Sequence, residues 1–105
     1  MLPSRSALVI GLMIAAPAQA LDDARRAELR DLLVQDCGSC HGMTLRGGLG
    51  PDITPEQLAN KPDSYLFGTI RDGHPGTPMP AWRGILGDDE IHHLVKLLKT
   101  GGEGS

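Results

Sequence analysis

Five consecutive residues of this 105-residue chain have types and a spacing that suggest one particular chemistry. Cys37, Cys40 and His41 form a Cys-x-x-Cys-His sequence, which is the attachment signature of c-type haem. Two thiols three positions apart on a helical turn can each form a thioether with one vinyl group on the same porphyrin edge. The next residue is then held under the ring, where its imidazole can supply an axial nitrogen to iron. The motif therefore predicts one covalent haem c.

Two other chemistries can use the same residues. A redox disulfide between Cys37 and Cys40 is the first, but dithiol oxidoreductases place this motif at a helix N-terminus after a strand, and nothing before Cys37 indicates a strand. A structural zinc site is the second, but it normally needs another pair of Cys or His ligands, and the chain has only two cysteines. Haem is favoured over both, and the disulfide is the main alternative.

The first 20 residues have the pattern of an export signal. Arg5 precedes an apolar run over residues 7–16, and residues 18–20 (Ala-Gln-Ala) fit a signal-peptidase site. The apolar run ends at Pro17 and is too short for a bilayer, which needs about 20 helical residues, so no stable membrane anchor is expected. We therefore predict that residues 1–20 are a cleaved signal peptide and that residues 21–105 form one domain in the periplasm.

Composition restricts the partners and favours a cofactor. The formal net charge is −3 at pH 7, which argues against nucleic acid or an anionic membrane surface as a partner. A small exported domain buries only a modest core and usually needs a disulfide, a metal or another staple. This chain has a single Trp, a single Tyr and a single Phe. A covalently held haem would supply the large apolar body that these few aromatic residues do not.

Apolar spacing and boundary residues predict an all-α domain with long loops. The expected helices cover residues 22–35, a short stretch from Thr54 to before Pro62, residues 63–72, and a final stretch from Asp88 to before Gly101. Asp22 and Asp88 are expected to be N-caps, Thr54 to begin a capping box, and Gly73 to be a left-handed cap. His92 and His93 on the final helix do not share a face, so a solvated or partly covered position is expected for them rather than a metal site.

A loop over residues 73–84 carries the candidate for the second axial ligand of the iron. Met79 lies between Pro78 and Pro80, which stiffen its backbone and present the thioether in one direction. A thioether is a weak, neutral ligand, so it competes with water only from a loop that is ordered in advance. His74 is the alternative, because imidazole binds iron more strongly and would give a lower potential. Met79 is favoured because His74 directly follows a helix end, where a surface or propionate-contacting role is easier.

Together these motifs resemble the class I c-type cytochromes over residues 21–105. The shared features are an N-terminal helix that runs into the Cys-x-x-Cys-His motif, a Gly50-Pro51 loop, a Met79-Pro80 loop and a C-terminal helix. The resemblance implies the cytochrome c fold, in which the terminal helices cross and short middle helices and long loops wrap around one haem. It also implies that the carbonyl of Pro51 accepts the Nδ1 hydrogen of His41. In relatives a Trp placed like Trp82 often lies near a propionate, although Trp82 could equally be plain core.

A narrower resemblance is carried by the residues around the two haem-binding motifs. Residues 37–51 and residues 74–82 are similar to the small periplasmic monohaem cytochromes of the c55X family, which are encoded with the haem-d1 nitrite reductases of denitrifying bacteria. This resemblance implies electron delivery to that reductase or a part in the maturation of its haem d1.

An iron with both axial sites filled by protein has no vacancy for a substrate, so the sequence predicts an electron carrier and not an enzyme. The carrier is expected to be a monomer that meets its redox partners transiently. Met43, Leu45 and Leu49 are candidates for an apolar contact patch at the haem edge, or else for packing against the haem face. The alternative function is a haem protein with a labile Met79, which would act as a small-ligand sensor or a peroxidase-like enzyme.

Overall fold

A computed structural model describes residues 21–101 of the chain. Within this range the regular elements are helices joined by loops, and no strand is present. The predicted all-α class is therefore confirmed. The predicted signal peptide, residues 1–20, lies outside the described residues. No helix between residues 21 and 101 has the length and apolar character that crossing a bilayer requires.

The first helical run leads without interruption into the Cys-x-x-Cys-His motif. It consists of α1 (Asp23–Leu32), a π-helical stretch η1 (Leu33–Cys37) and α2 (Gly38–His41). Asp22 is the N-cap of α1 as predicted, since its side chain accepts a hydrogen bond from the amide of Arg25 at 2.8 Å. The predicted end at residue 35 was wrong, because the amide of Gly38 bonds the carbonyl of Leu33 and carries the helix through a wider turn. Both cysteines and His41 thus belong to one continuous helical rod.

Two short helices occupy the middle of the chain, α3 (Pro55–Leu58) and α4 (Asp63–Asp72). The bounds of α4 agree with the prediction, and it ends at Gly73 as expected. Gly73 has φ 77° and ψ 179°, however, so it is not the left-handed helical cap that was predicted. Thr54 is the N-cap residue of α3 and Pro55 its first residue, as predicted, but the capping-box hydrogen bond is absent because the Thr54 hydroxyl donates to Oδ1 of Asp52 at 2.7 Å.

The last helix, α5 (Asp88–Thr100), is tied to the first at its N-terminus. Its N-cap is Gly87 and not Asp88, because the carboxylate of Glu90 reaches back to accept the Gly87 amide at 3.0 Å. The same carboxylate accepts a hydrogen bond from Nε of Arg25 on α1. These two bonds lower the pKa of Glu90, with the bond to Arg25 as the larger cause. The start of α5 is therefore fixed against the start of α1.

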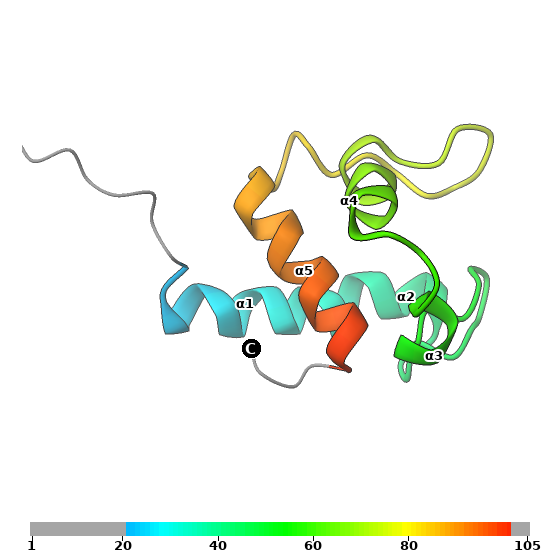
Figure 1. Ribbon diagram of the computed structural model, residues 1–105, viewed down its shortest axis with the longest axis horizontal. Helices are drawn as coiled ribbons and strands as arrows, with labels where there is room; N and C mark the ends of the chain where they lie inside the picture. Colours follow the sequence, from blue (N-terminus) through cyan, green and yellow to red (C-terminus); the bar gives the residue numbers. More distant parts are fainter. Residues whose placement is uncertain (1–20, 102–105) are drawn as a thin grey trace, which may run out of the picture.

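The core lies where α5 crosses α1. Figure 1 shows α5 running across the α1 rod, and both views show α4 beside α5. α5 contacts α1, α3 and α4, and its apolar side chains form the stripe that faces these helices. The fully buried side chains are Leu29 of α1 together with Ile91, Leu94, Val95 and Leu97 of α5. The predicted crossing of the terminal helices is confirmed.

His93 is an uncompensated polar group on α5. The residue is half-buried, and its Nε2 atom is buried with no hydrogen-bond partner among the described residues. Burial lowers the pKa of His93, and the positive charges of Arg26, Lys96 and Arg30 lower it further. The folded protein therefore favours the neutral imidazole.

Acidification should destabilise the fold through His93. A histidine whose folded pKa lies below its ordinary value of about 6.5 binds more protons in the unfolded state once the pH falls below that value. The free energy of unfolding should therefore decline as the pH falls below about 6.5. A His93→Leu variant should lose most of this slope, whereas His92→Leu, which changes the exposed neighbour, should keep it. Urea titrations across this range measure the slope, and equal slopes in all three proteins would exclude His93 as its source.

Candidate haem site

The imidazole of His41 is held by a hydrogen bond to the backbone. Its Nδ1 atom lies 2.7 Å from the carbonyl oxygen of Pro51, the contact that the family resemblance implied. Because a carbonyl can only accept, Nδ1 must carry the proton, and Nε2 is then the ring nitrogen with a lone pair for a metal. The contact thus sets both the orientation and the tautomer of the ring.

The loop after His41 is folded tightly back onto the motif. The amide of Gly47 donates to the carbonyl of His41 at 2.7 Å, and the amide of Gly50 donates to the carbonyl of Cys40 at the same distance. A Cβ atom at Gly48 would lie only 2.7 Å from the carbonyl oxygen of Cys40. The glycines of this loop therefore let the backbone approach α2 closely enough to return Pro51 to the His41 ring.

A methyl group at position 50 should disturb that ring. The Cβ of a Gly50→Ala variant would lie 2.8 Å from both Cε1 and Nδ1 of His41, so the imidazole must shift away from the Pro51 carbonyl. We expect a loss of about 1–3 kcal/mol in the free energy of unfolding, as for other overpacked sites, and a displaced Nδ1 proton resonance of His41. Gly84→Ala is the matched control, because nothing lies within 4 Å of its added Cβ. An unchanged resonance and an unchanged stability in Gly50→Ala would contradict the close fit.

The two thiols of the motif are in different environments. Cys37 is half-buried and packs against the hydrophobic core, whereas Cys40 is exposed, and both are free thiols. Burial, helped by the charge of Asp36, raises the pKa of Cys37 to about 11. Redox dithiols instead need a thiolate of lowered pKa, so the environment of Cys37 argues against the disulfide alternative.

A zinc site is not supported either. Within residues 21–101 no three side chains of the His, Cys, Asp and Glu types come together as they would around a metal ion. His92, which the sequence placed on a solvated or partly covered face, is exposed and stacks on the ring of Phe67, with centroids 4.2 Å apart.

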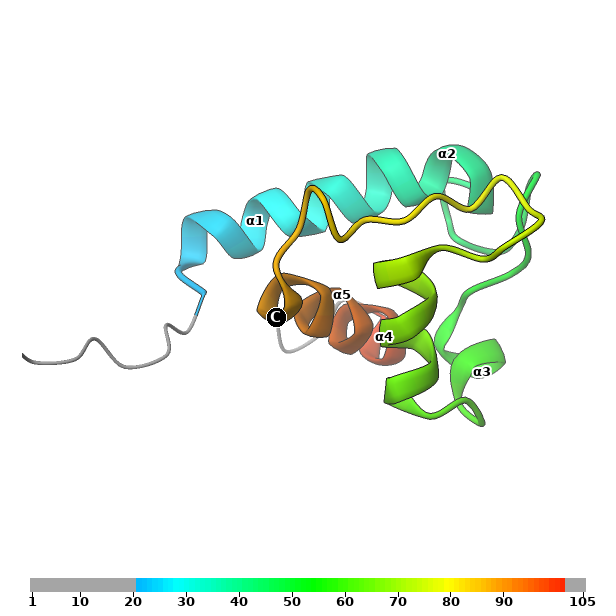
Figure 2. The same ribbon diagram turned by 90° about the horizontal axis from the view of Figure 1, so that it is seen from above.

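The loop that carries Met79 is attached to α4 at both ends. The amide of Gly73 bonds the carbonyl of Thr69 at 2.9 Å, and the amide of Trp82 bonds the carbonyl of Ile70 at 3.0 Å. Figures 1 and 2 agree that this loop and α2 lie at the same end of the molecule. Met79 is half-buried, whereas the alternative ligand His74 is exposed on the same loop. The fold thus brings the loop of the predicted methionine ligand and the predicted attachment motif to one end.

The other predicted residues differ in their exposure. Met43 is 60% and Leu49 is 95% exposed. Leu45 is half-buried and packs against the core, with φ 62°, so of the two alternatives given for it, burial by packing is favoured over an exposed patch. Trp82 is half-buried and also packs against the core. Its proposed contact with a propionate stays a prediction.

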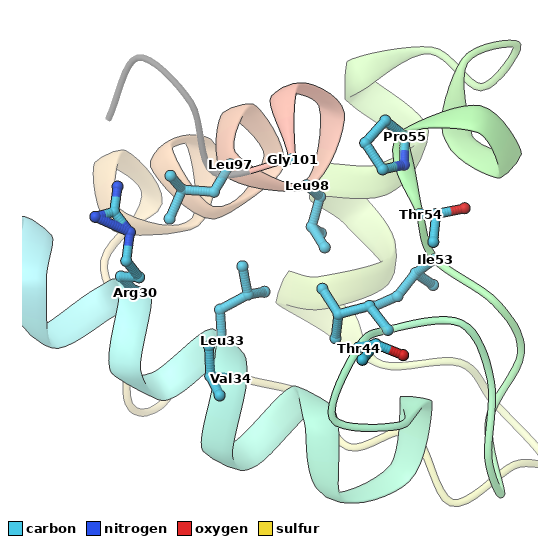
Figure 3. Close-up of a pocket in the computed structure, with 11 residues that line it drawn as sticks. Arg30, Leu33, Val34, Thr44, Ile53, Thr54, Pro55, Leu97, Leu98 and Gly101 are labelled. Atoms are coloured by element: carbon cyan, nitrogen blue, oxygen red, sulfur yellow. The ribbon is translucent and has the colours of Figure 1, made fainter.

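A pocket of about 300 Å³ lies between the first helical rod, the loop after His41 and α5 (Figure 3). Its walls come from η1, the loops after His41 and the C-terminal half of α5, and most of the side chains are apolar. None of Cys37, Cys40, His41 and Met79 lines it. The pocket therefore does not mark the predicted haem site.

The residues present fit a c-type haem by their chemistry. The two unpaired thiols supply the thioether bonds, the Pro51 carbonyl leaves Nε2 of His41 for iron, and the loop after His41 has glycine where any side chain would displace the ring. The free metal site and the redox dithiol each lack such support.

Known proteins are similar to this chain in sequence and in structure over most of the described residues. The family model described as cytochrome C oxidase, cbb3-type, subunit III matches residues 24–98. Cytochrome c55X of Pseudomonas aeruginosa is 48% identical over 99 residues, which cover 90% of this chain and 83% of that protein. The solved structure of a c-type cytochrome NirC is 53% identical, with a TM-score of 0.75, and the match covers 77% of this chain and 95% of that one.

A larger protein contains a similar unit. The structure of dihydro-heme d1 dehydrogenase NirN in complex with DHE is 34% identical, with a TM-score of 0.62, over 67% of this chain but only 15% of that chain. The likeness is thus confined to a small part of that protein. The family model, the cytochrome c55X sequence and the NirC structure each cover most of the described fold, and this chain accordingly belongs to the class I c-type cytochromes, in the group of cytochrome c55X.

Proposed function

We propose that this protein is a periplasmic electron carrier with one haem c, exported through a signal peptide that is cleaved after residue 20. Cys37 and Cys40 hold the haem by thioethers, and His41 and Met79 are the axial ligands of its iron. The contact of 2.7 Å between Nδ1 of His41 and the Pro51 carbonyl carries the proposal, because it orients the imidazole and leaves Nε2 as the nitrogen that can bind iron.

The proposed haem supplies a one-electron couple, and the protein supplies its setting. His41 and Met79 close both faces of the iron to substrates, which fits a carrier rather than an enzyme. Met79 adds no charge, and the apolar surroundings disfavour the more highly charged oxidised state, so the residues raise the reduction potential. Met43 and Leu49 are exposed beside the motif and give a redox partner an apolar surface to meet.

Two single substitutions test the choice of the second ligand. Met79→Ala should abolish the weak far-red absorption band of a methionine-ligated ferric haem and lower the reduction potential by more than 100 mV, roughly the effect expected when a thioether is replaced by water or imidazole. His74→Ala should leave both unchanged, because that side chain is exposed. Visible spectra and redox titrations of the two variants decide between the ligands. The reverse pattern would assign the iron to His74.

The physiological partner is the finer part of the proposal. Membership of the cytochrome c55X group supports a place in denitrification, with electron delivery to haem-d1 nitrite reductase as the first candidate. The likeness to part of NirN supports a second candidate, an accessory role in the maturation of haem d1. Stopped-flow mixing of the reduced protein with the reductase, and of the oxidised protein with a dihydro-heme d1 dehydrogenase, separates the two roles. Rapid electron transfer to the reductase supports the first, and transfer only with the dehydrogenase supports the second.

A further inference from the structure

The loop between His74 and Pro80 is ordered by very few backbone donors. Pro75, Pro78 and Pro80 have no amide hydrogen, so this segment has to satisfy its polar groups with the donors that remain. The amide of His74 donates to the carbonyl of Met79 at 3.2 Å, which closes the loop upon itself. The orientation of Met79 therefore depends on what else restrains its backbone inside this closed turn.

The hydroxyl of Thr77 supplies that restraint. Oγ1 of Thr77 donates to the carbonyl of His74 at 2.7 Å and accepts the amide of Met79 at 3.2 Å. The amide of Thr77 also donates to the carbonyl of His74 at 3.1 Å. One side chain thus joins the two ends of the turn, and its hydroxyl accepts the hydrogen bond that the Met79 amide donates.

The base of the turn is fixed from the other side. A Cβ atom at Gly73 would lie 2.9 Å from the Met79 carbonyl and 3.0 Å from the amide nitrogen of Ala81, so the backbone from Met79 to Ala81 passes directly over Gly73. The carbonyl of Met79 is therefore held against the end of α4, whereas its amide is held by Thr77. Contacts within the protein therefore restrain the peptide groups on both sides of Met79.

We propose that Thr77 is the positioning residue for the Met79 ligand. Its hydroxyl holds the Met79 backbone in the one orientation that presents the thioether, and without it the loop releases the thioether more readily. This inference rests on the proposed His41 and Met79 ligation. It adds that the Thr77 hydroxyl orders the loop in advance, which a weak thioether ligand needs in order to compete with water for the iron. The sequence Gly-Thr-Pro-Met does not by itself predict the two hydrogen bonds of the Thr77 hydroxyl.

The test uses the holoprotein and free imidazole as the probe of iron from which Met79 has dissociated. Thr77→Val keeps the shape of the side chain but removes its donor and acceptor. Because one exposed or partly exposed hydrogen bond contributes about 0.5–1.5 kcal/mol, we expect imidazole to bind about three- to tenfold more tightly to the ferric variant. The Met79 amide should exchange its hydrogen faster by a similar factor. Thr77→Ser retains the hydroxyl and should restore both values.

Thr100→Val is the matched control, because it removes a hydroxyl that bonds only the carbonyls of Lys96 and Leu97 on α5. Its imidazole affinity should equal that of the unchanged protein. If Thr77→Val retains the far-red methionine band, the normal imidazole affinity and the slow amide exchange, Thr77 has no positioning role. If the unchanged protein itself lacks the methionine band, the ligand assignment fails instead, and the two failures are distinguished by that one spectrum.

Discussion

A variant with serine at both Cys37 and Cys40 should be exported without any covalently bound haem. Each thioether needs a sulfur nucleophile that adds to a vinyl group, and the hydroxyl of serine does not replace it in that reaction. Mass spectrometry of the denatured chain should show the mass of one haem on the unchanged protein and none on the double variant. Because the haem is the largest apolar body in so small a domain, the double variant should also lose its cooperative unfolding transition.

Two single variants separate the contributions of the two thioethers. Cys37→Ser and Cys40→Ser should each leave one thioether and a lower yield of attached haem. Ser39→Ala is the control within the same motif, since its hydroxyl donates to the carbonyl of Asp36 at 2.8 Å and lies 3.9 Å from Sγ of Cys40 but supplies no sulfur for a thioether. Covalent haem on the double variant, or its absence from the unchanged protein, would overturn the assignment of the motif and restore the redox disulfide as an explanation.

The parts of the molecule that could be predicted from sequence are those set by local chemistry. The bounds of α4 follow from proline and glycine at its two ends, and the apolar stripe of α5 follows from its spacing. The Cys-x-x-Cys-His motif names its cofactor because all of its chemistry lies within five residues. The hydrogen bond from His41 to Pro51, by contrast, joins residues ten apart, and it was implied only by resemblance to a family.

The parts that could not be predicted depend on competition between alternative partners. Thr54 begins a capping-box sequence, yet its hydroxyl bonds Asp52, which lies closer in the loop. Leu45 is apolar and near the motif, but whether it faces solvent or the core depends on a backbone with φ 62°. The π-helical stretch η1 has no sequence signature of its own, because one wider turn changes a single hydrogen-bond partner. Thr77 is similar, since its two hydrogen bonds exist only once the loop has closed.

Leu29→Ala should produce one of the largest losses of stability among single substitutions outside the haem motif. Leu29 is the fully buried residue that α1 contributes to its crossing with α5, and its exposed fraction is 0%. Removing a buried leucine side chain costs about 2–5 kcal/mol, because the transfer free energy is lost and the cavity closes only partly. A domain of this size has a free energy of unfolding of only about 5–10 kcal/mol, so the variant should lose between about a fifth and all of its stability, and about half of it at the central values.

Leu49→Ala gives the same chemical change at the opposite extreme of burial. Leu49 is 95% exposed, so its truncation should alter the free energy of unfolding by no more than about 0.5 kcal/mol. Urea titrations of the two oxidised holoproteins, followed by tryptophan fluorescence and by the haem spectrum, measure the difference. Equal losses at both positions would mean that α1 is not anchored at Leu29. A loss at Leu29 alone shows that the helix carrying Cys37, Cys40 and His41 is fixed by its contact with α5, and that the haem motif depends on a crossing formed by the two ends of the domain.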